Sequence, residues 1–313
     1  MGRPLRIEYP GAFYHVTSRG NERRAIFLSP KNYERMIGYL ESATERYGAQ
    51  IHCFCLMTNH YHLLLETPEG NLHQILHHVN TSYTNYFNAK TGRVGHLFQG
   101  RYRAILVDKD RYALELSRYI HLNPVRAHMV RDPLLYPWSS FKDYAGERKG
   151  WDWVKTEWIL GQINGNEKRA RKGYRKFIRE VIGRAMKNPL EKVVGSAILG
   201  PEEFVDSVRE KWVEKRAYHR DIPSLRQLSK WPELSLIQKE AEGLFGKKGD
   251  ESRRVALYLS HRLSGRSLGE IGSHFGGIGP SAVSQNTWRL EERLKGDPEL
   301  LEKVNRLKRI LSE

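Results

Sequence analysis

Segments with strand and helix character alternate through the first 125 residues, and their order restricts the fold more than any other feature of the sequence. Strand composition and helical apolar spacing are read from the side-chain pattern. In chain order there is a strand at 13–18, a helix at 30–48, strands at 51–57 and 60–66, a helix at 71–88, a strand at 103–107 and a helix at 109–121. This order predicts an α+β, ferredoxin-like βαββαβ domain. We expect an antiparallel sheet with helices on one face and an open face that can meet a ligand.

The third strand carries two histidines around one bulky residue, and an apolar run follows them. The pair Thr58-Asn59 predicts a short turn into this strand. Because side chains alternate along a strand, His60 and His62 should point to the same face, roughly 6.6 Å apart along the chain, with Tyr61 on the other face. Two imidazoles on one face can form half of a metal site.

The helix from Lys109 onward offers the other half, because Tyr119 and Asn123 are four apart and share a helix face. Two imidazoles and a carboxamide oxygen would leave open positions on a divalent ion, which suits a substrate phosphate. The ion would polarise a phosphodiester while the tyrosyl oxygen attacks phosphorus and forms a covalent phosphotyrosine. Asn123 has a second interpretation, since a residue before proline avoids helical geometry. It could instead cap a new helix that begins with Pro124.

The charge of the chain points to a polyanionic partner. The formal net charge is +16 and the isoelectric point is near 9.8, which favours nucleic acid ahead of an anionic membrane. Neither a signal peptide nor an apolar run long enough to span a membrane is present. The two cysteines, Cys53 and Cys55, lie two apart on one predicted strand, which is poor geometry for a disulfide. We therefore expect a cytoplasmic, soluble protein without a membrane partner.

The C-terminal part of the chain has the pattern of a helix-turn-helix domain. Arg253 to Leu263 has helical apolar spacing, and Ser267 to Glu270 has the form of a capping box that opens a second helix. After a glycine-rich turn, a third helix begins at Ser281 and runs through Val283, Trp288 and Leu290. An apolar three-helix bundle without DNA binding is the alternative. The polar start of the third helix offers candidates for duplex contacts, namely Ser281, Ser284 and Gln285.

These patterns predict three parts of the chain. Residues 1–150 would form the catalytic domain, and residues 246–313 the helix-turn-helix domain. The pattern of residues 151–245 predicts helices with basic surfaces. This part would be a linker or a small helical module, and we find no catalytic cluster in its sequence. The all-α C-terminal region would follow the α+β domain.

The motifs around the histidines and the tyrosine resemble those of a known family. His60-Tyr61-His62 has the pattern of HUH single-strand endonucleases. Together with Gly95 to Arg101 and Tyr119 to Ala127, it occurs in the order and spacing of single-tyrosine transposases. The chain is most similar to the REP-associated tyrosine transposases, which are related to the insertion-sequence-200-like enzymes. The resemblance covers roughly residues 3–145.

This resemblance implies a metal-dependent DNA endonuclease and strand transferase, a transposase that cleaves single-stranded DNA beside hairpins through a 5′-phosphotyrosine intermediate. Tyr119 would be the nucleophile, and His60, His62 and Asn123 would bind Mg²⁺ or Mn²⁺. Members of the family act as dimers or as monomers, so a homodimer stays open.

Basic and amide side chains at predicted strand ends and loops are candidates for phosphate and base contacts, although a solvated surface accounts for any single one equally well. They are Arg19, Asn21, Arg23, Arg24, Gln99, Arg101 and Arg103.

Residues Arg253 to Leu294 are similar to the C-terminal duplex-binding domain of bacterial chromosomal replication initiators. The chain departs from that domain at Ile278 to Ser281, where the initiators carry an acidic-histidine-threonine run that reads bases. The sequence Gly246-Lys247-Lys248 lacks the spacing of a nucleotide-binding loop, which excludes an initiator ATPase. We therefore interpret the segment as a DNA-binding domain of the kind found in initiators, without the initiator ATPase.

Three other interpretations are open. A domesticated regulator would keep the fold and bind DNA without chemistry, and a ferredoxin-like RNA-binding module would act without an ion. A zinc site of Cys53, Cys55, His60 and His62 would place all four ligands on one sheet face, where they cannot readily surround a tetrahedral ion.

Overall fold

The computed structural model describes residues 7–147, 150–184, 188–213, 232–246, 249–264 and 266–311. They form two compact units, one within residues 1–228 and the other within residues 229–313, and each unit is described by itself. Among the described residues, no helix combines the length and the apolar composition needed to cross a membrane.

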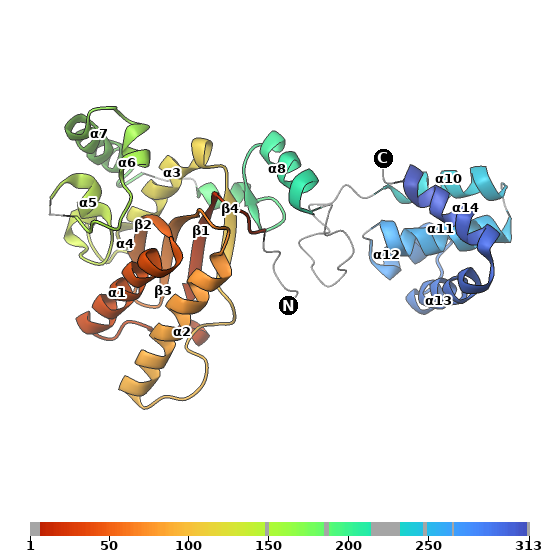
Figure 1. The fold of residues 1–313 in the computed structure, drawn as a ribbon, viewed down its shortest axis with the longest axis horizontal. Coiled ribbons are helices and arrows are strands. Elements are labelled where there is room, and N and C mark those ends of the chain that lie inside the picture. The colour runs from red at the N-terminus through yellow and green to blue at the C-terminus, as the bar shows by residue number, and fades with distance from the viewer. Residues whose placement is uncertain are drawn as a thin grey trace. The chain divides into compact units, whose positions relative to one another are not determined.

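The first unit contains the predicted order of elements, and the α+β class is confirmed (Figure 1). Ser29 and Asn32 form a capping box at the start of the first helix, and Gly48 ends that helix in the left-handed region with φ 65°. The elements are β1 (Ala12–Arg19), α1 (Pro30–Tyr47), β2 (Gln50–Leu56), β3 (His60–Thr67), α2 (Leu72–Thr91), β4 (Arg103–Val107) and α3 (Lys109–His121). In space the strand order is β2-β3-β1-β4-β5, and the first four strands are antiparallel.

Helices cover both faces of this sheet, so the expected open face is wrong. One face packs against α1 and α2 through a core that includes Val16, Leu63 and Leu65. The opposite face, with Cys55 and Leu64, packs against α3 and three later helices. These are α5 (Phe141–Ala145), α6 (Glu157–Gly161) and α7 (Glu167–Arg179). A strand buried on both faces is apolar along its whole length, as in Leu63-Leu64-Leu65, whereas a half-open strand alternates.

Several segments between residues 151 and 208 therefore belong to the packing of the first unit. Ile159, Tyr174 and Leu199 are buried on the α3 face, and Val205 lies in the core of the α1–α2 face. The corresponding elements are α6, α7, β5 (Ile198–Leu199) and α8 (Glu202–Val208). In this respect the segment expected to be a linker or a small module contributes to the core of the sheet domain.

Both edges of the sheet carry backbone partners. On the β4 edge, β5 pairs in parallel, a strand that the sequence pattern did not predict, and Leu106 N donates to Ala197 O over 2.8 Å. On the β2 edge, Leu56 N donates to Trp138 O over 2.9 Å, and Lys155 N donates to Ile51 O over 2.9 Å. The sheet is thus predominantly antiparallel with one parallel edge pair.

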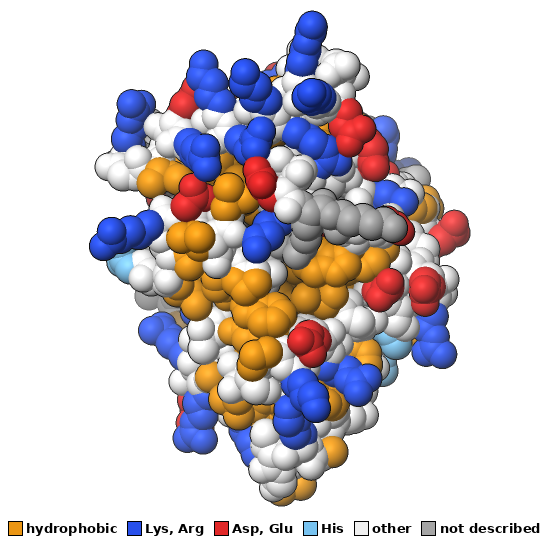
Figure 2. Space-filling model, turned by 90° about the vertical axis from the view of Figure 1, so that its left-hand side faces the viewer, with side chains coloured by type: hydrophobic (Ala, Val, Ile, Leu, Met, Phe, Trp, Pro, Cys, Tyr) orange, Lys and Arg blue, Asp and Glu red, His pale blue; other side chains and the backbone are white. Residues whose placement is uncertain are grey.

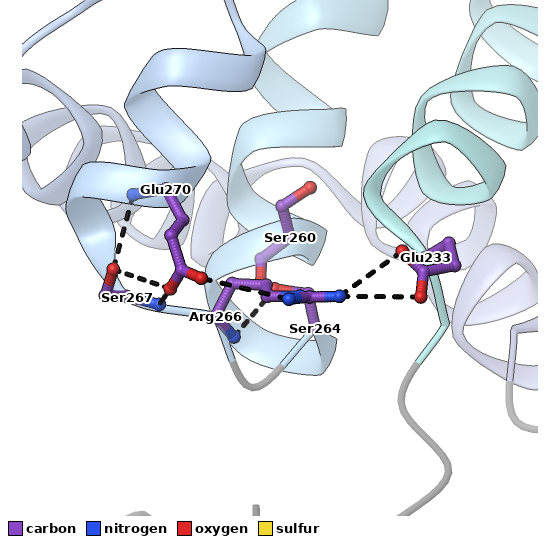
Figure 3. Close-up of polar contacts among 6 residues, drawn as sticks. All are labelled: Glu233, Ser260, Ser264, Arg266, Ser267 and Glu270. Carbon is purple, nitrogen blue, oxygen red and sulfur yellow. Dashed lines mark hydrogen bonds and ion pairs between the residues drawn. The ribbon is translucent and has the colours of Figure 1, made fainter.

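The second unit is helical, as predicted. Its elements are α10 (Leu234–Phe245), α11 (Asp250–Leu263), α12 (Leu268–His274), α13 (Pro280–Gly296) and α14 (Pro298–Ile310). Figure 3 shows the predicted capping box at α12, in which Ser267 N donates to Glu270 Oε2 over 2.8 Å and Glu270 N donates to Ser267 Oγ over 3.3 Å. The guanidinium of Arg266 lies 3.5 Å from Glu233, just before α10, and 3.8 Å from Glu270.

Helix α13 corresponds to the third helix predicted in this region, and it buries only two of the three apolar residues named there. Val283 and Leu290 are buried in the core, but the side chain of Trp288 is 63% exposed. Ser281, Gln285 and Trp288 are spaced by four and three residues, so they share one exposed face of α13 with Ser284 beside it. An apolar residue in a helical pattern is not necessarily a core residue, because the stripe that packs is decided by the neighbouring helices.

A buried histidine ties three segments of the first unit together. His121 ends α3, and its Nδ1 lies 2.8 Å from the Tyr174 hydroxyl of α7. Its Nε2 lies 2.9 Å from the Ser140 hydroxyl. Burial lowers the pKa of His121 to about 3, so the folded protein holds the neutral ring.

We predict that His121 makes the first unit sensitive to acid. The unfolded chain protonates this histidine below its ordinary pKa of about 6.5, whereas the folded chain does so only near 3. Stability is therefore lost as the pH falls below 6.5, by about 2 kcal/mol at pH 5 for this one group. Urea unfolding of the wild type and of His121→Gln at pH 7 and pH 5 measures the difference. Equal losses in both proteins would contradict the assignment.

Candidate active site

The β2–β3 hairpin places the two predicted histidines on the sheet face that α3 covers. Met57 N donates to His60 O over 2.8 Å, so Thr58-Asn59 is a two-residue turn. The ring centroids of His60 and His62 lie 5.0 Å apart. Tyr61 points to the opposite face, where its hydroxyl donates to Asn80 Oδ1 over 2.7 Å. The period of two along the strand accounts for this arrangement.

Helix α3 brings Tyr119 to the histidines. The ring of Tyr119 lies edge-on to that of His62, with 6.0 Å between the centroids, and the tyrosine is 8% exposed. The guanidinium of Arg126, one turn after the end of α3, lies 4.7 Å from the centroid of the Tyr119 ring. A cation over an aromatic face is attracted by the ring quadrupole. His62 and Tyr119, far apart in the sequence, thus face each other between the sheet and α3.

A third histidine, which the sequence pattern did not single out, belongs to this cluster. His15 on β1 has its Nε2 3.0 Å from His62 Nδ1, and the two rings stack with centroids 5.3 Å apart. Its ring also lies 6.3 Å from that of Tyr119. The sequence places His15 in the first predicted strand, but it does not show that its side chain lies on the same sheet face as His62. The strand order that sets β1 beside β3 cannot be read from local spacing.

The hydrogen bonds of the histidines leave one nitrogen of each ring free. His60 Nδ1 lies 2.7 Å from Asn59 Oδ1, and His62 Nδ1 is occupied by His15. In the part of the chain that the structure describes, Nε2 of His60 and of His62 has no hydrogen-bond partner. Burial lowers the pKa of His60 to about 4 and that of His62 well below its usual range, so both imidazoles are neutral. Two neutral imidazoles with free Nε2 atoms fit a divalent transition-metal ion.

Asn123 lies after the end of α3 and is half-buried. Leu122 separates α3 from the short α4 (Asn123–Arg126), in which Pro124 is near the first position. The amide nitrogen of Asn123 donates to Tyr119 O over 3.1 Å and to Ile120 O over 3.3 Å. It therefore satisfies carbonyls at the end of α3 and does not act as the cap of a following helix. This geometry leaves Oδ1 as the atom available to a ligand.

The predicted contact residues gather near the histidine end of β1 and β3. Arg19 is the β1 partner of His60 in the sheet register, and Arg103 on β4 pairs with Thr17. The loop with Gln99 lies beside the end of β1, since Gln99 N donates to Arg19 O over 2.8 Å and Asn21 N donates to Leu97 O over 2.8 Å. Asn21 is half-buried, and the exposed members are Arg19, Arg23, Arg24, Gln99, Arg101 and Arg103.

Two of these arginines have roles within the fold. Arg24 forms an ion pair with Glu22 at 2.6 Å. The carbonyl of Arg23 accepts a hydrogen bond from Asn59 Nδ2 over 2.8 Å, which ties the hairpin turn to the segment after β1. Glu22 and Arg23 also adopt positive φ values of 54° and 59°, uncommon for residues with a side chain. The segment is thus held in a defined shape beside His60.

The described residues do not support the zinc interpretation. Cys55 lies opposite His62 in the β2–β3 register, and Cys53 lies opposite Leu64 after a bulge. Burial raises the pKa of both thiols, which disfavours the thiolate form that zinc binds. Within the described ranges no group of three or more His, Cys, Asp and Glu side chains is placed to hold an ion.

Comparison with known proteins finds a family match for the N-terminal region. Residues 9–123 match the family model described as "Transposase IS200 like", which confirms the resemblance indicated by the three motifs. A solved structure of a REP-associated tyrosine transposase bound to a REP hairpin is 18% identical, with a TM-score of 0.41. That likeness covers 47% of this chain and 86% of the other.

The C-terminal region is similar to chromosomal replication initiator proteins DnaA. The protein from Rhizobium johnstonii is 41% identical over 61 residues, which are 20% of this chain and 13% of the initiator. The protein from Anaplasma marginale is 28% identical over 142 residues, which are 41% of this chain and 28% of the initiator. The chain thus spans only a small part of the length of these curated relatives.

We predict that the oxygen and the nitrogen of the Asn123 amide cannot exchange places. Asn123→Ala removes two hydrogen bonds and should lower the free energy of unfolding by about 1 kcal/mol. Asn123→Asp sets a carboxylate against the carbonyls of Tyr119 and Ile120 and should cost more. Urea unfolding at pH 7 compares the two variants, and an aspartate variant as stable as the wild type would contradict the observed orientation.

Proposed function

We propose that this chain is a metal-dependent enzyme that nicks and rejoins single-stranded DNA beside hairpins through a covalent link between Tyr119 and a 5′ phosphate. The family match of residues 9–123 supports a transposase, a DNA nicking and joining enzyme. The observation that carries the proposal is the contact of Tyr119 with His62, beside two imidazoles whose Nε2 atoms are free.

The residues that would hold the ion are His60 and His62 through Nε2, with Asn123 Oδ1 as a third ligand. The ion would be Mg²⁺ or Mn²⁺, and when bound it would supply polarisation of the scissile phosphodiester. The amide oxygen suits both ions and the imidazoles favour Mn²⁺, and three protein ligands leave positions for phosphate oxygens.

Tyr119 would perform the bond exchange. Its phenol oxygen attacks phosphorus and loses its proton, the bond from phosphorus to the 3′ oxygen breaks, and the departing 3′ oxygen takes up a proton. The phosphate is then bonded to the Tyr119 oxygen and keeps its bond to the 5′ oxygen of the DNA strand. Attack by a 3′ hydroxyl on this intermediate reverses the exchange and joins strands. The Arg126 guanidinium lies over the ring of Tyr119 and helps to hold this side chain in place.

The basic surface of the chain supports a DNA partner. Arg19 and Arg103 are exposed near the histidines, and both place positive charge close to them. Figure 2 shows Lys and Arg side chains above and below a central apolar area on one face of the molecule. Phosphate neutralisation by such side chains supplies most of the affinity for DNA, and it weakens as salt is added.

We propose further that the second unit binds duplex DNA as a helix-turn-helix domain. The similarity to initiator proteins lies in the C-terminal region, and α13 presents polar residues on an exposed face. That face includes Ser281, Ser284 and Gln285, which are side chains able to contact phosphates or base edges. Trp288 adds an exposed aromatic side chain to it.

The enzymatic proposal predicts a covalent protein–DNA adduct. Labelled single-stranded hairpin DNA incubated with the protein and Mn²⁺ should give an adduct that resists denaturation, and chelation of the ion should abolish it. Tyr119→Phe should remove the adduct because the nucleophilic oxygen is lost, whereas the matched variant Tyr112→Phe on the same helix should keep it.

The same experiment separates the rival functions. A regulator without chemistry would bind the hairpin and give no adduct. An RNA-binding module would prefer RNA, without need of an ion, and His60→Ala would leave its affinity unchanged. An adduct that survives Tyr119→Phe would refute Tyr119 as the nucleophile.

Duplex binding predicts an effect of Trp288 that is separate from the adduct. Trp288→Ala should weaken binding of the protein to a duplex about tenfold, since a lost side chain at a base-reading face typically costs about 1–3 kcal/mol. Ile310→Ala, an exposed apolar residue on α14, is the matched control and should have no effect. Fluorescence anisotropy measures both affinities, and equal affinities would contradict the assignment of α13 to the interface.

A further inference from the structure

The contact between His15 and His62 is unusual because it joins two imidazole rings that are both buried. His15 is 1% exposed and His62 is 7% exposed. Nε2 of His15 lies 3.0 Å from Nδ1 of His62, while Nδ1 of His15 has no partner among the described residues. Burial keeps both rings neutral, and leaving a buried ring nitrogen unpaired costs free energy. A valine or leucine at position 15 would avoid this cost.

Only one proton fits in this contact, so there are two arrangements. In the first, His62 Nδ1–H donates to His15 Nε2, and the Nε2 of His62 carries a lone pair. In the second, His15 Nε2–H donates to His62 Nδ1, and the Nε2 of His62 carries the proton. An ion can bind only a nitrogen with a free lone pair. The contact with His15 therefore decides whether His62 can be a ligand.

At the neighbouring histidine, His60, an amide group decides which ring nitrogen carries the proton. Asn59 Nδ2 donates to the Arg23 carbonyl over 2.8 Å, so its Oδ1 is the atom that faces His60. An amide oxygen only accepts, and His60 must therefore carry its proton on Nδ1 and a lone pair on Nε2. The turn thus holds His60 in the form that can bind an ion.

We propose that His15 is a positioning residue that holds His62 in the tautomer with Nδ1–H, so that Nε2 of His62 is free for a divalent ion. The inference rests on the proposed function of the site. His15 acts through His62 and does not touch the ion. It also fixes the ring plane of His62, because the two rings stack at an interplanar angle of 15°. Partners that orient metal-binding histidines commonly contribute 10–100-fold to metal affinity.

Two substitutions at position 15 distinguish positioning from simple packing. His15→Gln keeps an acceptor at the place of Nε2, because the end of a glutamine side chain reaches as far as that atom. His15→Leu has similar bulk and no acceptor. The matched control is His52→Leu, at another histidine of the sheet that is 3% exposed. The ring of His52 contacts the Lys155 carbonyl and the Glu66 carboxylate.

The experiment titrates the full chain with Mn²⁺ by calorimetry and records the ¹⁵N spectrum of the imidazoles without an ion. We expect His15→Leu to lower the Mn²⁺ affinity by about 10–100-fold and His15→Gln and His52→Leu to change it by less than about threefold. In the ¹⁵N spectrum, His62 should have a protonated Nδ1 in the wild type and in His15→Gln. In His15→Leu it should shift toward protonated Nε2. Thermal unfolding confirms that each variant folds.

The outcomes separate this inference from the proposed function. Wild-type affinity and an unchanged His62 spectrum in His15→Leu would overturn the role of His15, even if Tyr119 forms an adduct. A loss of affinity and a tautomer shift would support it, even if no adduct forms with any DNA. If the wild type does not bind Mn²⁺, a protonated Nε2 on His62 in the ¹⁵N spectrum overturns the inference.

Discussion

The packing of α3 onto the sheet is the interaction on which the candidate site depends. This helix buries Leu116 and Ile120 against the sheet face of Cys55 and Leu64, and the same packing sets Tyr119 against His62. The apolar surroundings also keep the histidines neutral, because a cationic ring loses its hydration there. Core formation and ligand chemistry therefore come from one contact. A helix shifted by one residue would rotate Tyr119 by about 100° away from the sheet.

Much of this arrangement could be predicted from local pattern. The period of two placed His60 and His62 on one face, and the Thr58-Asn59 turn set the register of their hairpin. The alternation of strand and helix spacing predicted the element order, and the capping residues at Ser29 and Ser267 marked where two helices begin. These features depend on neighbours within a few residues, which a sequence displays directly.

The rest depended on contacts between distant segments. His15 joins the site only because β1 lies between β3 and β4, and the position of a strand in a sheet is not written in its own spacing. The expected open face is covered because helices from beyond residue 140 return to it. Asn123 shows a third limit. The proline after it indicates a helix boundary, but the direction of the Asn123 amide is decided by the carbonyls it meets.

The covered edges of the sheet bear on how copies of this chain could associate. An exposed edge strand presents unpaired backbone groups that a second copy can use to continue the sheet. Here β5 occupies the β4 edge, and segments around Trp138 and Lys155 occupy the β2 edge. A two-chain sheet would have to expel one of these segments first. Assembly of the first unit, where it occurs, is thus a matter of side-chain surfaces, and it could be tuned by mutation without disturbing the strands that hold the histidines.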